Sequence, residues 1–82
     1  MKVFTEAGSV YEIDEHGICR KYRDGKLVDS FKALSIRSVP NTVTKMDDVY
    51  ELPDGELKIG DRLYISGINN WWLSTKIARI EY

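Results

Sequence analysis

Histidine and cysteine, which are common in catalytic pairs and zinc sites, are almost missing from this sequence. The chain has one of each, His16 and Cys19, three positions apart across a predicted turn, where the two side chains should diverge. A catalytic pair needs hydrogen-bond reach and a third group that orients the base, and the sequence indicates neither. Asp14, Glu15 and His16 are adjacent on that turn and point apart, so we expect no metal and no cofactor. We therefore expect no enzyme activity and no catalytic residue.

Long apolar runs and multiple cysteines are absent as well. No run approaches the roughly 20 residues of a membrane span, and the first residues lack the apolar stretch of a signal peptide. The lone Cys19 cannot form an internal disulfide, on which small secreted domains usually depend. The expected location is the cytoplasm, and we expect no membrane partner.

The sequence also lacks an excess of one charge sign. The net charge of −1 favours neither nucleic acid nor a membrane surface. The charges are nevertheless divided along the chain: residues 18–37 carry six basic and two acidic side chains, and residues 47–61 carry six acidic side chains and one lysine. We expect these segments to be neighbours in a sheet that neutralise each other across strands. The alternative is a bipolar surface that orients a partner.

What the sequence does contain is a period of two in its apolar residues, between closely spaced turns. This pattern predicts short antiparallel strands, and no stretch has helical periodicity over ten residues. Asp24-Gly25 is the strongest hairpin signal, because both residue types accept the positive φ of a tight turn. The chain predicts a single all-β domain, 1–82: a small antiparallel meander that closes into an SH3-like or similar small barrel. The expected strands are 2–6, 9–14, 18–23, 26–31, 34–39, 56–65 and 71–82.

Three segments have less regular patterns. Residues 42–48 are compatible with a strand, a loop or a short helical turn. Residues 56–65 are expected to form a bent strand, or two strands around Gly60, with a core contribution from Leu57, Ile59, Leu63 and Ile65. In 18–23, alternation divides the side chains between two faces, and we expect the core face to be that of Ile18, Arg20 and Tyr22.

The last predicted strand begins with two tryptophans, Trp71 and Trp72. Adjacent residues of a strand face opposite sides, so at least one of the indoles should be partly exposed. Two asparagines immediately precede Trp71, and tryptophan and tyrosine are frequent anchors of protein interfaces. An open barrel end or a dimer seam would also accommodate the second ring. The predicted partner-binding residues are Tyr64, Asn69, Asn70, Trp71 and Trp72.

A second candidate surface is basic. Arg20, Lys21, Arg23 and Lys26 surround Tyr22, a mixture of cations and an aromatic ring that single-stranded nucleic-acid sites use. Against this interpretation stand the negative net charge and the expected core position of Tyr22. We therefore rank nucleic-acid binding below protein binding.

Three segments resemble small proteins encoded by bacteriophages, particularly those that infect actinobacteria. Residues 5–14 are similar to the opening hairpin of these proteins, 57–63 to a strand with a glycine before apolar residues, and 74–81 to their closing strand. In the closing segment those proteins usually have a proline after the serine, whereas this chain has Lys76 after Thr75. The resemblance implies a phage or prophage origin, a bacterial cytoplasm and an interaction role, and it assigns no functional residue.

Together these observations predict a non-enzymatic interaction module, phage-derived, that binds a host or phage protein through the β-surface around Trp71-Trp72. One alternative is a small nucleic-acid-binding barrel that uses the strand Arg20–Arg23. The other is a homo-oligomer with a structural or assembly role.

Overall fold

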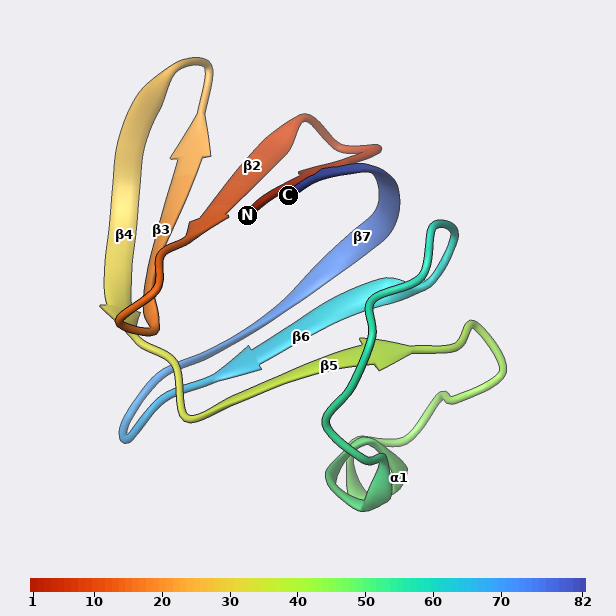
Figure 1. Cartoon of the computed structure of the whole chain (residues 1–82). Helices are drawn as coiled ribbons and strands as arrows, with labels where there is room; N and C mark the ends of the chain where they lie inside the picture. The colour runs from red at the N-terminus through yellow and green to blue at the C-terminus, as the bar shows by residue number, and fades with distance from the viewer.

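The computed structural model covers all 82 residues and contains seven antiparallel strands and one short helix (Figure 1). The strands follow one another in the order β4-β3-β2-β1-β7-β6-β5, so two meanders are joined where the first strand pairs with the last. The predicted all-β antiparallel fold is confirmed. The strands are β1 (Lys2–Thr5), β2 (Ser9–Ile13), β3 (Ile18–Arg23), β4 (Lys26–Lys32), β5 (Ser35–Val39), β6 (Arg62–Ser66) and β7 (Trp71–Glu81).

Strand β7 curls the sheet. Its first part pairs with β6 as far as Lys76, and its second part pairs with β1 from Ile77 onward. Figure 1 shows β7 bending between these two parts, so the β1–β4 half and the β5–β6 half face each other. The edge strands β4 and β5 are connected by Ala33-Leu34 but are not hydrogen-bonded neighbours in the sheet. The sheet is thus strongly curled, with an open side between β4 and β5.

The main core fills the space between the two halves of the sheet. Alternate residues of the strands point into it, as the period of two requires. A hydrophobic side chain from the connection 52–61 also enters this core, although its segment is not a strand, and Figure 1 shows that connection passing β5 on its way from α1 to β6. The buried members are Val3, Tyr11, Ile13, Cys19, Leu57, Leu63, Ile65 and Ile77.

A smaller cluster lies on the other face of β5 and β6, where the helix α1 (Met46–Glu51) packs. Val49 of the helix is buried there against Val39 and Tyr64. Asp47 and Asp48 in the first turn suit the positive end of the helix dipole. The helix ends before Pro53, because a residue that precedes proline is driven out of the helical region, and Leu52 is extended.

The hairpin prediction at Asp24-Gly25 is confirmed, whereas the predictions for residues 56–60 and for the core face of β3 are wrong. Both turn residues have positive φ, 53° and 75°. Residues 56–60, however, form no strand: Leu57 enters the core, while Ile59 is 60% exposed. The core face of β3 is also the reverse of the expected one, because Cys19 is fully buried and Tyr22 lies on the outer face, opposite Val10.

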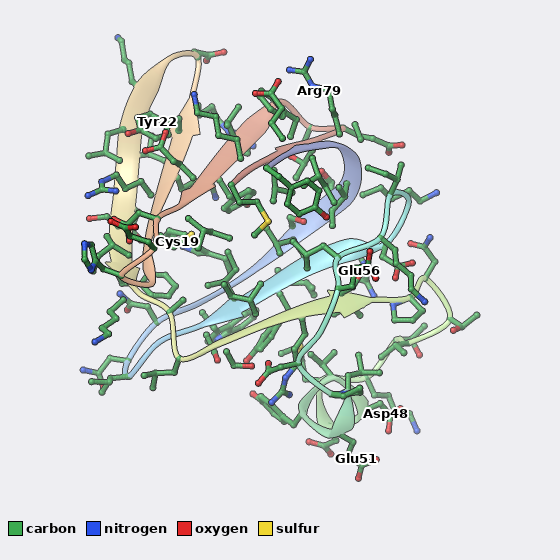
Figure 2. The ribbon with its side chains drawn as sticks, in the orientation of Figure 1. Cys19, Tyr22, Asp48, Glu51, Glu56 and Arg79 are labelled. Carbon is green, nitrogen blue, oxygen red and sulfur yellow. The ribbon has the colours of Figure 1, made fainter.

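The basic and acidic segments do not neutralise each other across neighbouring strands. The β3–β4 hairpin lies at one end of the sheet, and α1 packs near the other end, as the separation of Tyr22 from Asp48 and Glu51 in Figure 2 shows. One ion pair connects the two segments, between Arg37 and Asp54 at 3.4 Å. Arg20 pairs instead with a neighbouring carboxylate, that of Asp14, at 3.2 Å. Most of the two segments therefore lie apart, and the cations of the β3–β4 hairpin have the carboxylates of β2 and the adjoining turns as neighbours.

Candidate functional site

The two tryptophans of β7 face opposite sides of the sheet. Trp72 pairs with Ile65 and points to the core, where its ring centroid lies 4.3 Å from that of Phe31 and 5.5 Å from that of Tyr11. Trp71 pairs with Ser66 on the outer face and is 54% exposed. The expectation that one indole is exposed is confirmed, and the exposed one is Trp71. Trp72 does not belong to the outer surface, because strand alternation turns it inward.

An open hollow of about 320 Å³ lies beside Trp71 on the outer face. The hairpin loop 67–70 forms one wall, the exposed Tyr50 of α1 contributes to the other, and β5 and β6 contribute the floor. Four of the five residues predicted from the sequence line it. The complete lining is Arg37, Tyr50, Tyr64, Ser66, Gly67, Ile68, Asn69, Asn70 and Trp71, which we call the Trp71 hollow.

Three aromatic rings form the apolar surface of the Trp71 hollow. The ring of Tyr64 lies between the others, with its centroid 6.3 Å from Trp71 and 6.2 Å from Tyr50, which it meets edge-on. Tyr64 is almost fully buried, whereas Tyr50 and Trp71 are each more than half exposed. Burial raises the pKa of Tyr64, and the neighbouring Tyr50 hydroxyl raises it further, so the phenol stays protonated at neutral pH and able to donate a hydrogen bond.

The one cation in the lining, Arg37, is held by groups of the protein itself. Its guanidinium donates to the Val49 carbonyl oxygen at 2.9 Å and contacts the Asp54 carboxylate at 3.4 Å. The Ser35 hydroxyl donates to the same carboxylate at 2.6 Å, and this bond, together with Arg37, lowers the pKa of Asp54. Asp54 therefore remains ionised and balances the charge of Arg37 next to the Trp71 hollow.

The loop that carries Asn69 and Asn70 is held in place by a backbone hydrogen bond and by packing on Phe31. The Gly67 amide donates to the Asn70 carbonyl oxygen at 2.7 Å and closes the turn. A Cβ on Gly67 would lie 2.6 Å from Cδ2 of Phe31, so only glycine allows this close approach. Phe31 in turn packs on Trp72. Trp72 thus contributes to the site by positioning the loop through Phe31.

Five residues of the Trp71 hollow were not among the predicted site residues: Arg37, Tyr50, Ser66, Gly67 and Ile68. Arg37 and Tyr50 are distant from Trp71 in sequence and reach it only through the pairing of β5 with β6 and the packing of α1. Ile68 is 84% exposed. Its place immediately before Asn69 in a predicted loop was a signal that could have identified it, since an apolar residue gains little from exposure there.

The basic candidates do not form one surface. Lys21, Arg23 and Lys26 lie on one side of the β3–β4 hairpin, and Arg20 lies on the other. The Lys21 ammonium lies 5.7 Å from the centroid of the Tyr11 ring, and Arg23 donates to the Ser9 hydroxyl at 2.7 Å. Because Arg20 is paired with Asp14, three of the four cations already have partners within the chain.

Cys19 and His16 lie in different environments, one buried and the other exposed. Cys19 is fully buried, and this burial raises the pKa of its thiol to about 12, so it is not an activated thiolate. His16 is exposed and has an ionic contact only with Glu15, at 3.5 Å. No three histidine, cysteine, aspartate or glutamate side chains gather in an arrangement that could hold a metal ion.

Comparison with known proteins identified no relative of this chain. The chain matches no family model, no curated protein and no solved structure. The structure contains no helix with the length and apolarity needed to cross a membrane.

Proposed function

We propose that this chain is a non-enzymatic protein-binding module that recognises its partner in the Trp71 hollow. The observation that supports this proposal is the exposed indole of Trp71, which lies beside Tyr64 and Tyr50 over an open hollow. Tryptophan and tyrosine in such hollows supply large rigid contact areas with little loss of side-chain entropy. The resemblance to small phage proteins supports the same role, with a host or phage protein in a bacterial cytoplasm as the partner.

Polar groups at the rim of the Trp71 hollow can orient a bound partner by hydrogen bonds. Among the asparagine side chains, only Asn41 donates a hydrogen bond within the chain, so the amides of Asn69 and Asn70 are free to bind a partner. The loop that holds them is closed by its own backbone bond and packed on Phe31, which lowers the entropy lost when a partner binds. An apolar centre with a polar rim is the usual composition of a protein interface.

The test is selection of random dodecapeptides on the immobilised protein, with Trp71→Ala in parallel. We expect selected peptides to bind the Trp71→Ala variant about thirtyfold more weakly, the loss typical of a central aromatic anchor. Ile59→Ala is the matched control, because Ile59 is similarly exposed, at 60% against 54%, and lies outside the hollow. If every selected peptide bound the Trp71→Ala variant equally well, the Trp71 hollow would not be the site.

Self-association is a second candidate function, and one observation favours it. The edge strand β4 is largely exposed and has Leu27 and Val28 each 54% exposed. The opposite edge, β5, is covered, because Asp54 and Lys58 hydrogen-bond to Ser35 and Ser38 along it. An uncovered edge strand offers backbone groups to a second chain.

A further inference from the structure

We infer that the partner segment recognised in the Trp71 hollow is extended and cationic: a lysine or arginine side chain lies against α1, next to an apolar residue on Trp71. This inference rests on the proposed function and specifies the chemistry of its partner. Three features support it: the openness of the hollow, the free donors on one wall, and the unpaired carboxylates of α1, the helix that contributes Tyr50 to the other wall.

The shape favours an extended segment. The Trp71 hollow is open to solvent between loop 67–70 and Tyr50 of α1, so it admits a segment of a larger partner that continues beyond it on both sides. The free amides of Asn69 and Asn70 stand on the loop wall. An extended backbone presents carbonyl oxygens that such amides can bind, while the Trp71 ring covers an apolar side chain.

The charges determine which kind of segment fits. Asp47 precedes Tyr50 by three residues and Glu51 by four, so its carboxylate neighbours both of these side chains on the surface of α1. Both carboxylates and that of Asp48 are exposed, and none of them has an ion-pair partner in the chain. Figure 2 shows Asp48 and Glu51 projecting from the helix. Arg37 adds no net charge, because Asp54 balances it.

A cationic side chain would gain from two interactions at this wall. The carboxylates of α1 attract it over a distance of about 10 Å at ordinary ionic strength, and the exposed ring of Tyr50 can receive it by a cation–π contact. Lys45 is the lysine nearest to α1 in sequence and immediately precedes the helix. Four carboxylates follow it between residues 47 and 54, so negative charge is in excess there. An acidic segment would instead meet this excess of negative charge.

The peptide selection described above tests the inference through the composition of its products. Peptides that depend on Trp71 should be enriched in lysine or arginine next to an aliphatic or aromatic residue. The double variant Asp47→Asn, Glu51→Gln should bind them about tenfold more weakly at 50 mM NaCl and with a smaller difference at 0.5 M NaCl. The control double variant Glu15→Gln, Asp24→Asn makes the same change of charge far from the hollow and should bind as the wild type does.

The outcomes separate the two proposals. Peptides that depend on Trp71 but lack basic residues, or carry acidic ones, would overturn the cationic partner and leave the binding site standing. Equal binding to the α1 double variant and the wild type at both salt concentrations would overturn it as well. The absence of any peptide dependent on Trp71 would remove both proposals. Circular dichroism melts of the charge variants, which alter only exposed side chains, establish that each is folded.

Discussion

At the scale of single residues, Gly67 has the most restrictive role. Its Cα lies so close to the ring of Phe31 that a methyl group would contact Cδ2 at 2.6 Å and the Lys32 carbonyl oxygen at 3.0 Å. The Phe31 ring has little freedom to retreat, because it is packed on Trp72 with 4.3 Å between ring centroids. The constraint is therefore steric, since the φ of Gly67 is not in the left-handed region.

We expect Gly67→Ala to lower the free energy of unfolding by about 1–3 kcal/mol, the usual cost of overpacking. Urea denaturation followed by tryptophan fluorescence measures this change. Gly55→Ala is the control, because a Cβ there meets no atom within 4 Å and φ is not positive. Its effect should stay within about 0.5 kcal/mol. Equal effects of the two substitutions would contradict the close approach of Phe31.

At the scale of elements, the connection 52–61 covers the free edge of β5. It has no strand, yet it places Leu57 in the main core with 8% exposure and leaves Ile59 60% exposed two positions later. It is held against β5 by hydrogen bonds from the Ser35 hydroxyl to the Asp54 carboxylate and from the Lys58 backbone amide to the Ser38 hydroxyl. The cover depends on one apolar side chain and a few polar contacts.

Leu57→Ala should therefore lower the free energy of unfolding by about 2–4 kcal/mol, because it leaves a cavity in the core. Ile59→Ala, in the same connection, should change it by no more than about 0.5 kcal/mol. Both values come from chemical denaturation. A smaller loss for Leu57→Ala than for Ile59→Ala would show that the connection covers the core in another way.

The sequence alone predicted the elements whose signal is local. Strand alternation predicted that Trp71 and Trp72 face opposite sides, and Asp24-Gly25 predicted its hairpin. Both predictions depend only on neighbouring residues. The helix α1 escaped prediction, since six residues are too few to display a period of 3.6. The faces of β3 were reversed because Ile18, Cys19 and Tyr22 place apolar groups on both sides, and only packing decides between them. Arg37 and Tyr50 joined the Trp71 hollow through tertiary contacts that no local pattern contains.

At the scale of the whole molecule, the two edges of the sheet differ in their protection. The edge at β5 is covered and the edge at β4 is open. We expect light scattering to show the average mass rising from monomer toward dimer as the concentration increases. Leu27→Lys should abolish this rise, since a charged side chain on an edge strand opposes pairing.

Ile59→Lys is the matched control for that measurement, because Ile59 has comparable exposure and lies away from β4. It should leave the rise unchanged. A constant monomer mass at millimolar concentration would exclude self-association through β4. Leu27 and Val28 do not line the Trp71 hollow, so this result would not bear on partner binding there.

The bend in β7 also has a consequence for the order of events during synthesis. Strands β1 to β4 can pair with one another as soon as the ribosome has released them, but β1 has no neighbour on its other side until β7 follows. Lys2 must then find Glu81, a contact that spans nearly the entire chain. Such distant pairings are characteristic of folding in milliseconds to seconds. Until that step, the β1 edge and the inward-facing Val3 remain available to other nascent chains and to chaperones.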